Sequence, residues 1–381
     1  MLTDDEIRAF RSHFPILRDR TYLYNCSQGA LADVVEAAAA EYAQSWRTSL
    51  DPWREWSPVW EELRAAFARF IHADADEIAL VTSASAGINP IANALTFRER
   101  NRVVMGEFEF PTMGHIWLAQ QPRGAEVQFL EGVDHTLPLD SYDRAIDHRT
   151  AIVPVTQVSY LNGFRPDIAG IARIAHQRGA LVFLDGYQDC GTRPFDVKAL
   201  DIDFFVTGTL KYLLGPPGLA FLYVRRELIP SLTPSITSWL AQRNPFDFDA
   251  RTLDPAPTAR RFDSGTPPVP NIYMARAALA LLTDVGLDNI ALQVERLTGA
   301  FLEGIGRLRI ASKTPASSVG PLVVLRAHDA PALASRLAER GIAVSARRDG
   351  VRFAFHGYNT MEDVHTALEA LKSEIDLAVR A

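Results

Sequence analysis

The sequence is poor in cysteine, and this scarcity excludes two common means of stabilising a domain. Only Cys26 and Cys190 occur among the 381 residues. Two cysteines cannot form a disulfide framework, and they cannot make up a zinc site. We therefore expect no metal centre and two free thiols, as in a cytoplasmic protein.

Long apolar runs and an excess of basic residues are missing as well. No stretch of roughly 18 apolar residues occurs, so no transmembrane helix is expected. Acidic residues outnumber basic ones by 46 to 39, which gives a formal net charge of −7. Nucleic acids and acidic membranes favour a basic face, so neither is an expected partner. The first 19 residues are charged and amphipathic, unlike a signal peptide.

The first half of the chain alternates short apolar runs with amphipathic stretches typical of helices. The predicted strands are 78–81, 102–105, 126–130, 151–155, 181–184, 204–206 and 220–224. Several are apolar on both faces, as in strands that helices cover on both sides. The pattern predicts an α/β domain with a mostly parallel sheet, in which ligands bind beyond the carboxyl ends of the strands.

The second half begins with an irregular stretch and ends in a smaller α/β unit. Residues 231–270 are rich in proline, aromatic and charged residues and carry no regular period. The predicted elements after this stretch are helices 271–283 and 290–308, strand 321–325, helix 330–340, strands 342–345 and 351–354, and helix 361–377. We expect a large domain over 21–265 and a small C-terminal domain over 266–381 that also takes in 1–20.

Lys211 and Asp185 form the most informative pair in the chain. Each follows an apolar strand-like run, and a glycine- and proline-rich turn comes after Lys211. Both side chains are therefore expected at the same edge of the sheet, where a cleft can hold them. Pyridoxal phosphate (PLP) needs such a pair, because it forms a Schiff base with a lysine while an anion keeps its ring nitrogen protonated. The alternative is a surface lysine beside an unrelated aspartate.

Motifs around this pair follow one another in a fixed order. They are Tyr22-Leu-Tyr-Asn-Cys-Ser27, Thr82-Ser-Ala-Ser-Ala-Gly-Ile-Asn89, Phe108-Glu-Phe-Pro-Thr112, Val158-Ser-Tyr-Leu-Asn-Gly163, Asp185-Gly-Tyr-Gln188, Lys211-Tyr-Leu-Leu-Gly-Pro-Pro-Gly218, Arg261-Phe-Asp-Ser-Gly-Thr266 and Val351-Arg-Phe-Ala-Phe-His-Gly-Tyr-Asn-Thr360. The second follows a strand and opens a helix, where backbone N–H groups can meet a phosphate.

Together these motifs resemble the class V aminotransferase superfamily of fold-type-I PLP enzymes, over nearly the whole chain. That family includes cysteine desulfurases, kynureninases and isopenicillin-N-epimerase-like proteins. The resemblance implies a PLP-dependent transferase fold of the α/β class, with a large domain and a small C-terminal α/β domain. It also implies a homodimer with shared active sites.

The resemblance assigns roles toward the cofactor residue by residue. Lys211 is the catalytic lysine. The implied cofactor contacts are Asp185 to the pyridinium nitrogen, Gln188 to the phenolic oxygen, Phe110 stacked on the ring, Ala84 and Ser85 at the phosphate, and Thr266 at the phosphate of the partner subunit. Leu210 replaces the usual histidine or tyrosine before the lysine, and Thr209 is the candidate to supply a hydroxyl instead. Trp239 matches a kynureninase segment, with core or interface packing as its alternative.

On the substrate side, the resemblance gives Arg352 the α-carboxylate, which a guanidinium binds as a bidentate fork. Asn25 and Tyr160 are candidate substrate neighbours, and a structural turn and a buried tyrosine are their alternatives. The segment 340–353 contains no cysteine, so a persulfide-forming desulfurase is not expected. The implied function is a β-lyase that cleaves a C–S or C–C bond of an α-amino acid. A true aminotransferase, an epimerase or racemase, and a silent PLP-fold binding protein remain open.

Overall fold

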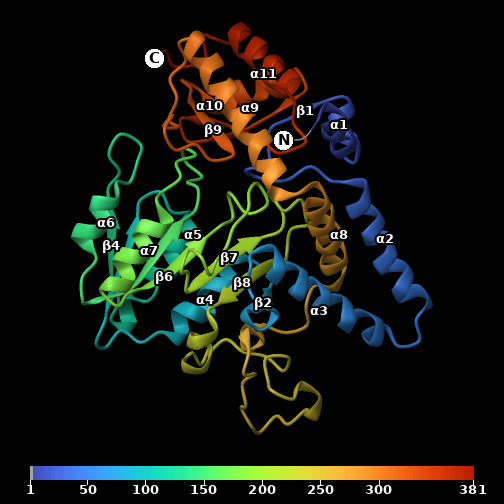
Figure 1. The fold of residues 1–381 in the computed structure, drawn as a ribbon, viewed down its shortest axis with the longest axis vertical. Helices are drawn as coiled ribbons and strands as arrows, with labels where there is room; N and C mark the ends of the chain where they lie inside the picture. The colour runs from blue at the N-terminus through green and yellow to red at the C-terminus, as the bar shows by residue number, and fades with distance from the viewer. Residues whose placement is uncertain (1–2) are drawn as a thin grey trace.

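A seven-stranded sheet forms the centre of the large domain in the computed structural model, which describes residues 3–381 (Figure 1). Its strands are β2 (Ile78–Val81), β3 (Arg102–Gly106), β4 (Glu126–Leu130), β5 (Thr150–Thr156), β6 (Leu181–Asp185), β7 (Phe204–Gly208) and β8 (Ala220–Val224). Their order is β2-β8-β7-β6-β5-β3-β4, and only β8 is antiparallel to its neighbours. The predicted strands and the mostly parallel sheet are confirmed.

Helices cover both faces of this sheet. They are α2 (Asp33–Thr48), α3 (Pro52–Phe70), α4 (Ala84–Ala94), α5 (Pro111–Leu118), α6 (Leu139–Ala145), α7 (Ile168–Gln177) and α8 (Val269–Val285). Neighbouring residues of one strand enter different cores, because side chains alternate across a strand. Phe204 and Val206 pack with α4 and α5, whereas Phe205 packs with α3, α7 and α8.

A second, smaller sheet belongs to the C-terminal part of the chain. The strands β9 (Leu322–Arg326), β11 (Ser345–Arg347) and β12 (Gly350–Ala354) pair antiparallel in the order β11-β12-β9. The helices α9 (Leu287–Arg307), α10 (Ala330–Glu339) and α11 (Met361–Ser373) share a separate apolar core with this sheet. The predicted small α/β unit is therefore present.

The N-terminal segment joins this smaller unit through a short parallel pair. Helix α1 (Asp4–Ser12) precedes strand β1 (Thr21–Tyr22), which pairs with β10 (Ile342–Ala343). Helix α8 shares its core with α2 and α3, although the predicted boundary assigns α8 to the small domain. The boundary at residue 265 stays a prediction.

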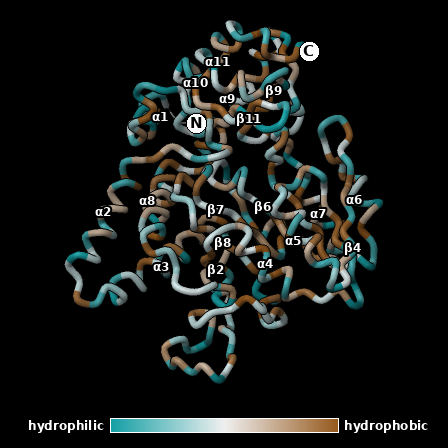
Figure 2. Tube along the Cα trace, turned by 180° about the vertical axis from the view of Figure 1, so that it is seen from behind, coloured by the Kyte–Doolittle hydropathy of each residue, from teal (hydrophilic) through white to brown (hydrophobic). Residues whose placement is uncertain are grey.

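An irregular excursion leaves the large domain between η4 (Arg226–Ser231) and α8. It contains the short 3₁₀ turns η5 (Pro245–Asp247) and η6 (Ala259–Phe262). In Figure 1 it extends below β2, at the end of the molecule farthest from the small domain, and Figure 2 shows the same placement from behind. Other 3₁₀ turns are η1 (Pro15–Arg18), η2 (Ala75–Glu77) and η3 (Gln121–Arg123).

Across residues 3–381, no single helix has the length and apolar composition needed to cross a membrane. The bent pair α8 and α9, with 78° between the two helices, passes that test when both are taken together.

Candidate active site

The carboxyl ends of β6 and β7 bring the predicted lysine and aspartate to one edge of the large sheet. Asp185 is the last residue of β6, and Lys211 comes three residues after β7 ends at Gly208. The two strands are parallel neighbours, with Asp185 opposite Val206. The sheet topology therefore places both side chains where ligands bind in such folds.

The amine of Lys211 lies beside two aromatic rings. Its Nζ is 4.1 Å from the ring centroid of Tyr187 and 5.6 Å from that of Phe110. Burial lowers the pKa of Lys211 to about 8, and the nearby carboxylate of Asp185 opposes this shift. A lysine with a lowered pKa has a larger neutral fraction near neutral pH, and the neutral amine is the nucleophile.

Asp185 is buried, with only 6% of its surface exposed. Its Oδ1 accepts a hydrogen bond of 2.9 Å from the backbone N–H of Tyr187, which fixes the carboxyl group. Burial raises the pKa of Asp185, while this N–H and Lys211 oppose the shift. A cationic ring N–H brought to this carboxyl would lower its pKa and hold it ionised.

Gln188 reaches from the same turn to the opening segment of the chain. Its Nε2 donates a hydrogen bond of 3.0 Å to the carbonyl oxygen of Cys26. The other amide atom, Oε1, is buried and has no partner among the described residues. Buried polar atoms are rarely left unpaired, so this oxygen is available to accept a hydrogen bond from a ligand.

The N-terminus of α4 offers donors for an anion. Ser83 caps the helix, because its Oγ accepts from the N–H of Ala86 at 3.1 Å. The N–H groups of Ala84 and Ser85 precede the first helical hydrogen bonds, so they are free to bind a phosphate. The Ser85 hydroxyl lies 3.5 Å from that of Thr112 on α5.

The hydroxyl of Thr209 is engaged within the chain. It donates to the carbonyl oxygen of Pro216 and also lies 3.1 Å from the carbonyl oxygen of Leu219. The side chain thus closes the turn that carries Lys211. Its predicted contact with the cofactor stays a prediction, since this bond already uses its only proton.

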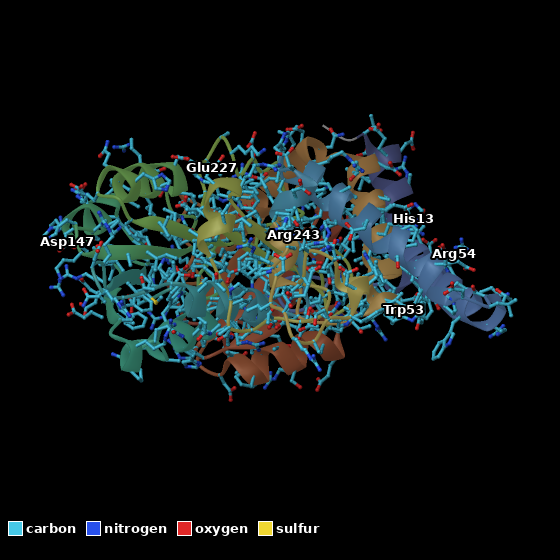
Figure 3. The ribbon with its side chains drawn as sticks, turned by 90° about the horizontal axis from the view of Figure 1, so that it is seen from below. His13, Trp53, Arg54, Asp147, Glu227 and Arg243 are labelled. Carbon is cyan, nitrogen blue, oxygen red and sulfur yellow. The ribbon has the colours of Figure 1, made fainter. Side chains whose placement is uncertain are left out.

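Thr266 and Trp239 belong to the excursion and to the segment that leads back from it. Thr266 is exposed. The Trp239 ring lies 6.3 Å from that of Trp53 on α3 and 6.0 Å from that of Phe248. Figure 3 shows Trp53 and Arg243, a residue of the excursion, on the same underside of the molecule. The predicted contacts of Thr266 and Trp239 with a cofactor stay predictions.

Arg352 is a buried cation that has only neutral partners. It lies on β12 and is 2% exposed. Its Nη2 donates to the hydroxyls of Ser27 at 2.9 Å and Ser345 at 2.6 Å, and its Nη1 to the carbonyl oxygen of Tyr160 at 3.4 Å. Its Nε has no partner, and no carboxylate of residues 3–381 forms an ion pair with it. A buried charge needs compensation, so this guanidinium is suited to an anionic ligand.

The two other predicted substrate neighbours differ in how they are bound. The side chain of Asn25 is fully buried, donates to the carbonyl oxygen of Ala354 at 2.9 Å and accepts from the hydroxyl of Tyr358. The ring of Tyr160 packs edge-on against Phe110, with 5.0 Å between centroids. Asn25 thus ties the opening turn to β12, while Tyr160 extends the aromatic surface beside Lys211. Their roles toward a substrate stay predictions.

Sequence reasoning missed Glu109, the residue before the predicted stacking ring of Phe110. Its side chain is buried, and Oε1 accepts from the N–H of Thr156 at 2.8 Å. The other oxygen, Oε2, has no partner in the described chain. Burial raises the pKa of Glu109 to about 8, and the charge of Asp185 adds to the shift. The glutamate follows Phe108, a residue type that predicts a buried segment, and this was the available signal, although Phe110 on its other side is 43% exposed.

The Glu109→Gln variant is expected to change how stability depends on pH. A carboxyl whose folded pKa lies above its unfolded value keeps its proton in the folded state while the unfolded chain ionises. Unfolding free energy should therefore fall from about pH 4.5 to about pH 8, by on the order of 1 kcal/mol per pH unit. Glu109→Gln removes this contribution, so its urea-measured stability should decline less over that range. Glu131→Gln, an exposed match, should behave like the unchanged protein, and an equally steep decline in Glu109→Gln would contradict the prediction.

The described groups fit the cofactor that the sequence predicts. A buried amine, a carboxyl at a strand end, two free helix N–H groups and the unpaired Oε1 of Gln188 lie around the ends of β6 and β7. PLP carries an aldehyde, a ring nitrogen, a phosphate and a phenolic oxygen, and each can meet one or more of these groups.

Comparison with known proteins agrees with this fit. Residues 25–367 match the sequence model of the family described as aminotransferase class-V. The chain is 34% identical over 366 residues to the uncharacterized aminotransferase YcbU of Bacillus subtilis, covering 96% of this chain and 97% of that protein. It is 29% identical over 394 residues to a kynureninase of Deinococcus radiodurans, covering 98% and 94%.

Solved structures share the fold. An apo cysteine desulfurase from Thermococcus onnurineus superposes with a TM-score of 0.89 at 23% identity, covering 99% of both chains. A cysteine desulfurase from Escherichia coli superposes with a TM-score of 0.87, also at 23% identity, covering both chains completely.

Proposed function

The chain belongs to the aminotransferase class-V family, and we propose that it acts as a β-lyase on an α-amino acid. It is a PLP-dependent enzyme with the fold-type-I architecture. The observation that carries the substrate class is Arg352, a buried guanidinium without a carboxylate partner among residues 3–381. A substrate α-carboxylate supplies the missing charge.

Each residue of the site has a separate task in this reaction. PLP, when bound, supplies the electron sink. The carboxylate of Asp185 holds the proton on the ring nitrogen, and Lys211 moves the proton at the substrate Cα. Arg352 fixes the carboxylate, so that the bond to be broken is held in one orientation. Phe110 and Tyr160 exclude water from the side of the site that they cover.

Two observations favour a lyase over a desulfurase that works through a persulfide. A persulfide acceptor must be an accessible thiol, and both cysteines of the chain are buried, Cys26 at 1% and Cys190 at 3% exposure. The ring of Phe110 stands beside Lys211 and carries no proton to exchange with a thiol substrate.

The edge-on contact between Phe110 and Tyr160 favours an apolar or aromatic substrate side chain.

An aminotransferase is the second candidate, and the relative from Bacillus subtilis supports it because its name describes an uncharacterized aminotransferase at 34% identity. The same lysine, aspartate and arginine serve both reactions. An aminotransferase additionally requires room for a keto acid as second substrate.

We also propose that the enzyme is a homodimer with shared active sites. Thr266 and the ring cluster of Trp239, Phe246 and Phe248 support this, since they are partly or largely exposed in the isolated chain, with Phe246 at 64% and Phe248 at 72%. If a second copy covers this surface, Thr266 of the first copy would lie near the phosphate site of the second copy.

The deciding experiment mixes the PLP-loaded protein with single amino acids and follows the cofactor spectrum and the products. The set includes cysteine, cystine, cysteine sulfinate, alanine, aspartate and kynurenine. A lyase should release pyruvate, ammonia, sulfide, alanine or anthranilate over many turnovers without any keto acid. A spectral change that stops after one equivalent and reverses only with a keto acid would establish the aminotransferase instead.

A further inference from the structure

Tyr187 is the aromatic residue closest to the amine of Lys211, yet the Asp-x-x-Gln motif leaves its position open. The ring is half-buried in the turn after β6, between Asp185 and Gln188. Its centroid lies 4.1 Å from Nζ of Lys211, compared with 5.6 Å for Phe110. A group attached at this amine is therefore next to both rings.

The position of the ring is set by a glycine on the neighbouring strand. A Cβ atom added to Gly208, the last residue of β7, would lie 2.2 Å from both Cζ and the hydroxyl oxygen of Tyr187. Any side chain at position 208 would thus displace the phenol. The absence of one allows the ring to lie directly on the end of β7.

Tyr187 packs beside the helix that offers donors to an anion. Tyr187 packs against the apolar core that contains Ala84 and Ile88 of α4 and Val206 of β7. Burial raises the pKa of Tyr187, and the charge of Asp185 adds to it, so the hydroxyl keeps its proton. This hydroxyl forms no hydrogen bond to the part of the chain that the structure describes, so it is available as a donor.

Two neighbouring side chains of the Lys211 turn cannot donate a hydrogen bond to the cofactor phosphate. Leu210, directly before the lysine, is apolar, and the hydroxyl of Thr209 already donates to Pro216. We propose that Tyr187 is a cofactor-binding residue whose ring forms a second aromatic wall of the pyridine slot and whose hydroxyl donates to the cofactor phosphate. The assignment concerns binding rather than the bond that is cleaved, so it holds for a lyase and an aminotransferase alike.

The test titrates the cofactor-free protein with PLP and with pyridoxal, which lacks the phosphate, and follows intrinsic fluorescence and visible absorbance. In Tyr187→Phe the ring remains and the hydroxyl is lost. The Kd for PLP should then rise about tenfold, as for a lost hydrogen bond to a charged group, with no change for pyridoxal. In Tyr187→Ala the Kd should rise for both ligands, because the ring wall is lost as well.

Tyr142→Phe is the matched control. Its hydroxyl is also buried without a partner among the described residues, but it lies in the other core of the sheet. Neither Kd should change in this variant. Equal effects of Tyr187→Phe on PLP and pyridoxal, or no effect on PLP, would overturn the phosphate contact. Unchanged binding of both ligands by Tyr187→Ala would overturn the whole assignment, and far-ultraviolet circular dichroism verifies that each variant is folded.

Discussion

Lys211→Ala is expected to abolish the visible absorption of the bound cofactor and to lower turnover at least about a thousandfold. Among residues 3–381, no other lysine stands at the carboxyl ends of β6 and β7, where the amine of Lys211 lies near the rings of Tyr187 and Phe110. Absorbance after PLP addition and product formation at saturating substrate measure the two effects.

The matched control is Lys372→Ala, which removes a lysine whose side chain is 66% exposed. This variant should keep the absorption band and the activity. A Lys211→Ala protein that still develops the band would show that another amine holds the cofactor, and it would refute the assignment.

The lowered pKa of Lys211 adds a pH dependence to the same experiment. With a pKa of about 8, the neutral fraction of the amine rises roughly tenfold per unit below that pH. The initial rate of PLP uptake by the cofactor-free protein should rise in the same proportion between pH 6 and 7 and level off above pH 8. A flat profile would show that the amine is not the rate-determining titrating group.

Much of the sheet and the centre of the site could be predicted from the sequence, because both rest on local signals. Apolar runs bounded by turns predict strands. Asp185 ends one such run, and Lys211 comes three residues after another. The position of Arg352 on a strand of the small unit was recognisable for the same reason.

The remaining features depend on contacts between distant segments. The buried carboxyl of Glu109 accepts a hydrogen bond from Thr156, 47 residues later. The ring of Tyr187 can lie against the neighbouring strand because Gly208 on that strand has no side chain. Asn25 binds the carbonyl oxygen of Ala354, 329 residues away. No window of the sequence contains both partners of such a contact, so the motifs alone could not distinguish structural roles from catalytic ones.

Arg352→Lys is expected to lower kcat/KM for the amino-acid substrate by about 10²–10³-fold, mainly by raising KM. Lysine keeps the positive charge but offers a single point of contact instead of a fork, so it cannot hold Ser27 and Ser345 and also pair both carboxylate oxygens. Losing two charge-assisted hydrogen bonds completely would cost about 3–6 kcal/mol, at about 1.5–3 kcal/mol each. The expected decrease in kcat/KM corresponds to a smaller loss, about 2.7–4.1 kcal/mol, because the lysine recovers part of the interaction.

The comparison that isolates the carboxylate uses two ligands for each protein. The unchanged enzyme should strongly prefer an amino acid to the corresponding amine, which lacks the α-carboxylate, and Arg352→Lys should lose most of this preference. PLP affinity should be unaffected, since the guanidinium faces Ser27, Ser345 and Tyr160 rather than Asp185 or α4. Arg326→Lys, on the neighbouring strand β9 and exposed, is the control and should retain the preference. If Arg352→Lys discriminates between acid and amine as well as the unchanged enzyme does, the buried guanidinium has another ligand and the substrate class must be reassigned.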